Sequence, residues 1–231
     1  MEYSKPMSRK KRSYWPVLVG VLIPPLLVVL AAWWWGNIQR EQDRQFNAVI
    51  ASASEKYKLE PQLIRAVIWR ESDFDTRAYG MAEERGLMQV TPIAAGEWAK
   101  AENVENFRTV DLFDSRTGIM AGSWYLSRAI SRWADSDVPM VFALAEYNAG
   151  RTNARRWAED LPSPTAALFI EKIDFPTTKK YVLDVLDRYH YYREHPDPQV
   201  WEVVWSKASG YWWRWLERRQ VRKIKEQQAK P

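Results

Sequence analysis

The stretch LIRAVIWRESDF, residues 63–74, places an acid on an otherwise apolar helix face. At helical spacing Ile64, Val67 and Ile68 fall on one side, and Glu71 follows on the same side. Such an acid loses solvation, and its position near a helix C-terminus adds the negative end of the helix dipole, so we expect a raised pKa. General-acid catalysis near neutral pH requires a group of this kind. A structural glutamate paired with an arginine is the alternative, and periodicity alone does not decide between them.

The composition indicates a folded chain with few metal-binding side chains. Its 231 residues are 46% apolar and 14% aromatic, which excludes a disordered protein. Cysteine is absent, so disulfides, thiolate metal sites and cysteine nucleophiles are excluded. His190 and His195 lie close together in the sequence and could ligate a metal. A solvated helix end is the preferred interpretation, and we expect neither a metal nor a cofactor.

The net charge of +5 is concentrated at the two ends of the chain. Residues 1–13 carry five basic side chains against one acid, and residues 214–231 carry seven against two. The residues between them therefore have a net charge of −4. An acidic central region is a poor match for the phosphate backbone, so we expect no nucleic-acid partner.

An uncharged stretch, residues 13–39, is long enough for the roughly 20 residues that cross a bilayer. We predict a cytoplasmic basic N-terminus over residues 1–13 and a transmembrane anchor over residues 14–36, with Trp33–Trp35 at the far interface. This predicts a single-pass protein of the plasma (inner) membrane with its remaining chain on the periplasmic, outer side. A signal peptide cleaved after Leu30-Ala31-Ala32 is the alternative.

Beyond the anchor the apolar pattern predicts helices and no strand. We expect a compact all-α domain over residues 37–195, followed by a Trp-rich basic helical tail over residues 196–231. Pro61 and Pro92 suit first helical turns, and Thr91 suits an N-cap. The six predicted helices contain the stretches 46–57, 61–71, 92–100, 119–133, 137–150 and 182–189, of which the fifth begins at Asp137 and ends at Gly150.

Five sequence blocks occur in the order and at the spacing of one known family. They are ESDF at 71–74, GLMQVTP at 86–92, DLFD at 111–114, AEYNAG at 145–150 and FIEKIDFPTTKKYV at 169–182. With these blocks the chain resembles the family 1 lytic transglycosylases, whose soluble lytic transglycosylase (SLT) domain has a lysozyme-like, goose-type fold. The resemblance covers about residues 48–189 and implies an all-α lysozyme-like domain behind the membrane anchor.

The resemblance also implies a reaction and its residues. The glutamate of the ES pair is the sole catalytic acid and base in that family, which points to Glu71. The substrate would be peptidoglycan glycan strands, cleaved without water between N-acetylmuramic acid and N-acetylglucosamine to leave 1,6-anhydromuramyl ends. No cofactor or metal is implied. Tyr147 would place its hydroxyl against Glu71. The substrate-binding residues expected from these matches are Ser72, Met88, Gln89, Tyr147 and Asn148.

The chain departs from the family pattern at several positions. The family commonly has a serine at Gly80 that supports the catalytic glutamate, so we expect Glu71 to lack one hydrogen-bond partner. It has a Gly-Ala pair at Glu83-Glu84, a methionine at Thr91, and proline and glutamate where Asp174 and Thr177 stand. These departures leave two other hypotheses open. One is a goose-type lysozyme that hydrolyses the same bond with a second carboxylate from Asp73, Asp75, Glu83 or Glu84. The other is a catalytically impaired, membrane-anchored scaffold that binds the cell wall.

The basic tail has three interpretations. Its tryptophans lie on helical faces beside many arginines and lysines. They would pack against the domain, lie on the anionic membrane surface, or bind a protein partner that the sequence does not identify.

The predicted anchor has a direct test. The full chain should remain in the membrane fraction after high-salt and carbonate washing, and deletion of residues 1–36 should release a soluble domain. Fractionation followed by N-terminal sequencing measures both properties. A mature protein that begins near Ala31 or Trp33 would show that the segment is a signal peptide.

Overall fold

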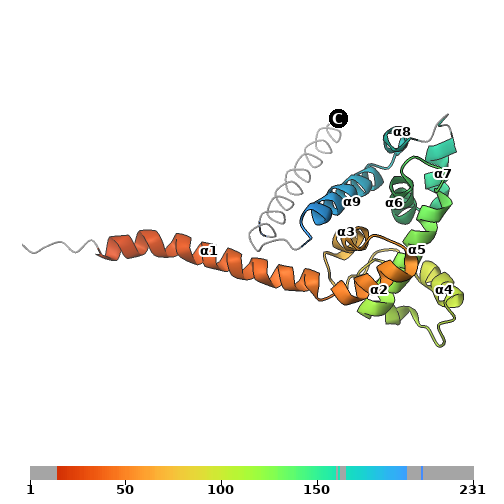
Figure 1. Cartoon of the computed structure of the whole chain (residues 1–231). Helices are drawn as coiled ribbons and strands as arrows, with labels where there is room; N and C mark the ends of the chain where they lie inside the picture. Colours follow the sequence, from red (N-terminus) through yellow and green to blue (C-terminus); the bar gives the residue numbers. More distant parts are fainter. Residues whose placement is uncertain (1–14, 160, 162–164, 197–203, 205–231) are drawn as a thin grey trace, which may run out of the picture. The chain divides into compact units, whose positions relative to one another are not determined.

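The structure, a computed structural model, describes residues 15–159, 161, 165–196 and 204 (Figure 1). The chain divides into two units, one of residues 1–40 with 199–231 and one of residues 41–198. The predicted N-terminus, residues 1–13, and the predicted tail beyond Pro196, apart from Val204, lie outside the described residues.

Helix α1, Trp15–Arg44, contains the predicted anchor. It runs through Pro24 and Pro25 and extends eight residues past the predicted end of the span at residue 36. Its segment Gly20–Glu41 is long and apolar enough to cross a membrane. Its apolar side chains are largely exposed, for example Val28 at 68%. Length, composition and exposure agree with a membrane span.

The second unit is helical throughout its ordered elements. The described residues contain no strand and only isolated bridges that join Arg85 to Tyr79 and to Val90. The all-α prediction is therefore confirmed. The elements are α2 Asn47–Tyr57, α3 Pro61–Ser72, α4 Pro92–Ala101, the 3-10 helix η1 Thr109–Phe113, α5 Ser115–Arg132, α6 Pro139–Ala149, α7 Arg151–Glu159, α8 Ala166–Lys172 and α9 Pro176–Glu194. The six predicted helices correspond to α2 to α6 and α9, whereas η1, α7 and α8 were not predicted.

Local signals explain the start of α4 and the end of α6. Thr91 caps α4 as predicted, because its side chain accepts a hydrogen bond from the backbone N–H of Ala94. Gly150 ends α6 with a φ of +82° and a ψ of 157°, a region that only glycine adopts readily. Both residues therefore have the roles that the sequence indicates.

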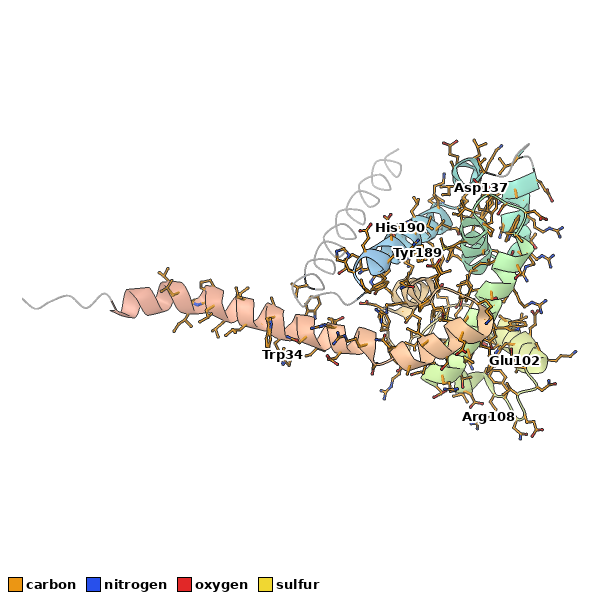
Figure 2. All side chains as sticks on the ribbon, viewed as in Figure 1. Trp34, Glu102, Arg108, Asp137, Tyr189 and His190 are labelled. Carbon is orange, nitrogen blue, oxygen red and sulfur yellow. The ribbon has the colours of Figure 1, made fainter. Side chains whose placement is uncertain are left out.

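The start of α6 differs from the prediction. The helix begins at Pro139, two residues after Asp137, and no side chain caps it. The Asp137 carboxylate instead accepts hydrogen bonds from the N–H groups of Val138 and of Ala166, the first residue of α8, at 2.8 and 2.9 Å. Figure 2 labels Asp137 among the side chains of the domain. Asp137 thus accepts a hydrogen bond from the first turn of α8, 29 residues further along the chain, and a local sequence pattern cannot reveal such a contact.

The core forms where α5 packs against α2, α4 and α6, while α9 packs against α3 and α6. Gly122 of α5 lets the loop before α4 approach closely, since a Cβ there would lie 2.6 Å from Cβ of Met88. Trp98, Trp124 and Trp157 are all buried, so each of these tryptophans packs in the core. The fold therefore holds the 86–90 loop against α5, close to the end of α3.

A buried ion pair joins α5 to α6. Glu146 is only 1% exposed and accepts hydrogen bonds from the Arg132 guanidinium and, at 2.8 Å, from Nε1 of Trp133. Buried charges are tolerated when they are paired and hydrogen-bonded, as here. The pair fixes the segment of α6 that also contains Tyr147.

Removal of Glu146 alone should leave the Arg132 guanidinium partly buried without its ion-pair partner. Glu146→Leu should lower the free energy of unfolding by about 3 kcal/mol, because Arg132 keeps its desolvation without its partner. The double variant Arg132→Met/Glu146→Leu should recover more than half of that loss. Urea unfolding of the three proteins measures the effect. Equal losses in the single and double variants would show that the pair is not the cause.

Candidate functional site

Glu71 lies in the last turn of α3, at the end of its apolar stripe. Ile64, Val67 and Ile68 are fully buried, and Glu71 is half-buried at the point where the helix meets the surface. The helix stops at Ser72 because Asp73 adopts the left-handed conformation with a φ of 49°. The predicted face is therefore present, and it directs the acid to the edge of the core.

Tyr181 of α9 is the hydrogen-bond partner of Glu71. Its hydroxyl donates to Oε1 of Glu71 at 2.7 Å, and its side chain is 1% exposed. Tyr181 was not among the site residues predicted from the sequence, although it lies four residues before Val185 on the buried face of the same helix. That spacing and the family block that contains it were the available signals. The acid thus has a neutral donor in place of an arginine partner.

Tyr147 lies close to the site but does not bond to the acid. Its hydroxyl donates to the carbonyl oxygen of Met88 at 2.8 Å, so the predicted hydrogen bond to Glu71 is wrong. Tyr125 contacts the Tyr147 ring edge-on, with centroids 5.6 Å apart. Burial, together with the negative charge of Glu71, raises the pKa of Tyr147 well above its ordinary value, so it stays a donor.

The pKa of Glu71 is raised from an ordinary value of 4.5 to about 7. Burial of the carboxyl group is the main cause, because it disfavours the charged form. The hydrogen bond from Tyr181 and the charge of Arg70 act in the opposite direction, and the charge of Glu84 adds to the rise. A carboxyl group that is close to half-protonated at neutral pH can donate a proton and later accept one. The raised pKa expected from the sequence is therefore present.

Gln89 fixes the loop that faces the end of α3. Its side-chain amide nitrogen donates to the carbonyl oxygens of Ala78 and Gly86 at 3.1 and 3.0 Å. Ser72 donates from its hydroxyl to the carbonyl of Leu87 at 2.9 Å, which ties α3 to the same loop. Both side chains bond to the backbone, so they hold the shape of the site.

The remaining predicted residues have different positions. The Met88 side chain is fully buried against Gly122 and does not line an open surface, so only its backbone faces the site. Asn148 is exposed at the end of α6, where its Oδ1 accepts a hydrogen bond from Thr178 at 2.8 Å. The predicted set therefore divides into groups near the acid and groups that support the loop or the core.

Gly80 leaves space that an acid fills. A Cβ at this position would lie 2.2 Å from Oε2 of Glu84 and 3.0 Å from Oε1 of Gln89. Glu84 is half-buried, whereas its neighbour Glu83 is exposed. Asp73 and Asp75 are exposed as well. Of the four candidate second carboxylates, Glu84 alone faces inward.

Two further departures from the family pattern have structural roles. Thr91 caps α4, and Asp174 accepts hydrogen bonds from Arg156 at 2.6 and 2.9 Å and from Nε1 of Trp157 at 2.7 Å. The hydrogen bonds from Arg156 are the main reason that the pKa of Asp174 falls to about 2. Asp174 therefore links α7 to the segment between α8 and α9.

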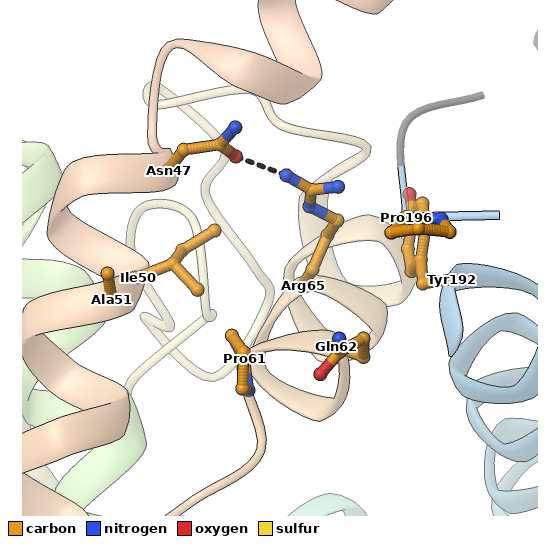
Figure 3. Close-up of a pocket in the computed structure, with 8 residues that line it drawn as sticks. All are labelled: Asn47, Ile50, Ala51, Pro61, Gln62, Arg65, Tyr192 and Pro196. Atoms are coloured by element: carbon orange, nitrogen blue, oxygen red, sulfur yellow. Dashed lines mark hydrogen bonds between the residues drawn. The ribbon is translucent and has the colours of Figure 1, made fainter. Parts of the chain in front are cut away.

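A separate pocket of about 210 Å³ lies between α2, α3 and the end of α9 (Figure 3). Arg65 in this pocket donates to Oδ1 of Asn47, and its guanidinium lies 5.3 Å from the Tyr192 ring centroid. Tyr192 follows Tyr181 by eleven residues, about 16 Å along a helix. The pocket is therefore distinct from the site at Glu71.

Metal ligands are not gathered in the described part of the chain. No group of three or more His, Cys, Asp or Glu side chains there could hold a metal ion. His190 is exposed, and the His195 ring stacks on Tyr191 with centroids 4.7 Å apart.

The fold and the site together define an all-α, lysozyme-like domain organised around one acid. The family model of the Transglycosylase SLT domain matches residues 48–169, more than half of the chain. The chain belongs to this family, which confirms the resemblance carried by the five sequence blocks.

Known relatives extend the comparison. Membrane-bound lytic murein transglycosylase F of Desulfosudis oleivorans is 34% identical over 114 residues, which are 48% of this chain and 23% of that protein. An inactive mutant of lytic transglycosylase Slt from Pseudomonas aeruginosa, with glutamine in place of one glutamate, is 28% identical with a TM-score of 0.59 over 68% of this chain and 25% of that chain. The 70 kDa soluble lytic transglycosylase of Escherichia coli is 25% identical with a TM-score of 0.60 over 67% of this chain and 25% of that chain. The chain thus spans about a quarter of the length of these relatives.

The environment of Glu71 can be measured directly. Carbon-detected NMR of the side-chain carboxyl groups should show Glu71 titrating with a midpoint near pH 7. Tyr181→Phe removes a donor that favours the charged form, so the midpoint should move to higher pH. Tyr189→Phe is the control, because that hydroxyl on the same helix donates to Glu60 at 2.8 Å. A midpoint in the parent near the ordinary value of 4.5 would contradict the buried environment.

Proposed function

We propose that this protein is a peptidoglycan lytic transglycosylase that cleaves the β-1,4 bond between N-acetylmuramic acid and N-acetylglucosamine. The observation that carries the proposal is the half-buried Glu71 carboxyl group, whose raised pKa of about 7 lets one residue act as acid and then as base. Membership of the SLT family and the names of the relatives support it. Glycan strands of peptidoglycan are the substrate.

The reaction needs one carboxyl group. Protonated Glu71 gives its proton to the glycosidic oxygen, and the bond from that oxygen to C1 of N-acetylmuramic acid breaks while the acetamido group of this sugar assists at C1. The Glu71 carboxylate then takes the proton of the C6 hydroxyl as the C6 oxygen closes onto C1. The 1,6-anhydro ring forms without water, and Glu71 ends protonated for the next cycle. Glycosidases that use two carboxylates need the second one to activate water or to form a covalent intermediate, and neither step occurs here.

Neighbouring groups support the acid in this scheme. Tyr181 orients the Glu71 carboxyl group through its hydrogen bond and stabilises the carboxylate that forms after proton transfer. Gln89, Tyr147 and Asn148 border the bound glycan. Ser72 and Met88 act through the loop that they hold, so we assign them to the support of the binding site.

Hydrolysis of the same bond is the second candidate. A goose-type lysozyme mechanism would use a second carboxylate to activate water, and Glu84 is the inward-facing acid available for it. The products distinguish the two reactions, since hydrolysis leaves reducing muramic ends and transglycosylation leaves anhydro ends. An impaired scaffold would bind sacculi and release neither product.

The chain organisation follows from the same proposal. Residues 1–13 lie in the cytoplasm, residues 14–36 cross the inner membrane once, and residues 37–195 form the catalytic domain on the periplasmic side. The apolar helix α1 and the membrane-bound relative support this arrangement. Residues 196–231 are the Trp-rich basic tail, which packs against the domain, contacts the anionic membrane surface or binds a protein partner.

Replacement of the acid tests the proposal. Glu71→Gln keeps the shape of the side chain but transfers no proton, so the release of anhydromuropeptides should fall by about a hundredfold to ten-thousandfold or more. The fold should remain, because a neutral amide replaces a desolvated acid. Mass spectrometry of digested sacculi and thermal unfolding measure the two properties, with the exposed Glu55→Gln of α2 as control. A Glu71→Gln variant with near-parental release of anhydro products would overturn the assignment.

The pH dependence of stability adds an independent check. The folded-state pKa of Glu71 lies above its ordinary value, so the parent binds this proton more tightly when folded. Its contribution to stability is complete below about pH 4.5 and is lost as the pH rises through about 7. Glu71→Gln should therefore gain stability relative to the parent above pH 7 and match it near pH 4.5. A salt-bridged structural glutamate would give the opposite sign above pH 7.

A further inference from the structure

A tight turn brings the side chain of Glu84 back over Gly80. The Gly80 N–H donates to the carbonyl of Glu84 at 2.8 Å, and the Glu83 N–H donates to the carbonyl of Gly80 at 3.2 Å. The Glu84 carboxylate accepts a hydrogen bond from the N–H of Ala82 at 2.8 Å. These bonds hold the carboxylate 2.2 Å from the point where a Cβ of residue 80 would lie. Glycine at this position leaves room for the acid.

Gln89 directs a second acceptor to the same point. Its amide nitrogen is engaged by two backbone carbonyls, of Ala78 and Gly86, which fixes the orientation of the amide. Oε1 of Gln89 is therefore turned toward Gly80, 3.0 Å from the same Cβ position. Two acceptor oxygens therefore lie around the Cβ position of Gly80, and both can accept a further hydrogen bond from a donor group of a ligand.

This acceptor pair belongs to the neighbourhood of Glu71. Tyr181 from α9 bonds to Glu71, the charges of Arg70 from α3 and Glu84 from the turn act on the pKa of Glu71, and the charge of Glu71 acts on the pKa of Tyr147 from α6. Glu84 is the one acid among them, and its charge raises the pKa of Glu71. Ser72, the residue after Glu71, donates to the carbonyl of Leu87 at 2.9 Å, two residues before Gln89, so a ligand bonded to Gln89 and Glu84 would lie near Glu71.

We propose that Glu84 is a specificity-determining residue of the glycan site, where its carboxylate and Oε1 of Gln89 together accept hydrogen bonds from a hydroxyl or amide N–H group of the bound sugar. The inference rests on the proposed function, because it takes the glycan strand as the ligand. A sugar chain offers donors at its hydroxyl and acetamido groups, which match a pair of acceptors. Gly80 then has a role as well, since a side chain there would displace the carboxylate.

The experiment compares Glu84 with its neighbour. Glu84→Gln removes the charge and keeps the size, while Glu83→Gln removes the same charge from an exposed side chain one residue earlier. The full-length chain in detergent is titrated by calorimetry with a tetramer of N-acetylglucosamine, and kcat/KM is measured against pH with glycan strands isolated from sacculi. Glu84→Gln should weaken tetramer binding and raise KM by about fivefold to tenfold, because a charged acceptor becomes a neutral one.

If Glu84 only held the turn in shape, its replacement would not change the pH dependence of kcat/KM. Loss of the Glu84 charge should shift the alkaline limb of kcat/KM to lower pH, since Glu71 then loses its proton more easily. Glu83→Gln should leave binding, KM and the limb within twofold of the parent. The proposal is overturned if Glu84→Gln behaves like Glu83→Gln.

Gly80 supplies a second route to the same group. Gly80→Ala should reproduce the loss of binding, because its Cβ displaces the Glu84 carboxylate. In a Glu84→Ala background the same change should add no further loss, as a double-mutant cycle would show. Additive losses would overturn the proposal.

The outcomes separate this inference from the proposed function. A parent that cleaves sacculi with a Glu84→Gln variant that binds normally supports the function and overturns the role of Glu84. A parent that binds the tetramer through Glu84 without cleaving sacculi supports the role of Glu84 and overturns the proposed function. A parent that neither binds nor cleaves overturns both.

Discussion

The hydrogen bond from Tyr181 to Glu71 is the interaction on which the site depends. It joins α3 to α9 across 110 positions of the sequence, so it exists only when the whole domain has folded. The bond also explains why an acid can end an apolar stripe. A neutral hydroxyl satisfies the carboxyl group without cancelling its charge, whereas an arginine in its place would hold the glutamate ionised. The site therefore combines a hydrogen-bonded acid with a pKa that stays high.

Two contributions raise the pKa of Glu71 and two lower it. Burial and the charge of Glu84 raise it, while the Tyr181 hydroxyl and the charge of Arg70 lower it. Arg70 is held away from full effect because its guanidinium nitrogen Nε donates to Asp184 at 3.0 Å. The cation that acts on Glu71 is therefore already paired with another acid. The balance leaves Glu71 close to half-protonated at neutral pH, which is the condition for a residue that must both give and take a proton.

The sequence predicted those parts of the structure that depend on local periodicity. The stripe of α3, the long helices and the Thr91 cap follow from spacing and are confirmed. Contacts between distant segments were not predictable in this way. Three contacts depend on how elements far apart in the chain pack together. They are the hydrogen bond from Tyr181 to Glu71, the hydrogen bond from Tyr147 to the Met88 carbonyl, and the hydrogen bond from the Ala166 N–H to Asp137. The short helices α7 and α8 were not predicted, because a few residues give too little hydrophobic periodicity to recognise a helix.

Backbone strain marks the same region as the side-chain chemistry. Among the described residues, seven other than glycine have a positive φ, and four of them, Asp73, Phe74, Glu83 and Gln89, lie in the two segments that surround Glu71. Such conformations cost free energy and persist only where packing and hydrogen bonds enforce them. Phe74 is held by stacking on Phe46, with centroids 6.2 Å apart, and Gln89 by its two bonds to backbone carbonyls. The strain stops α3 directly after the acid and turns the loop so that Gln89 faces Gly80. The fold thus maintains costly backbone conformations around one carboxyl group, and this concentration of strained residues supports the proposal that the end of α3 is the functional site, independently of any pKa.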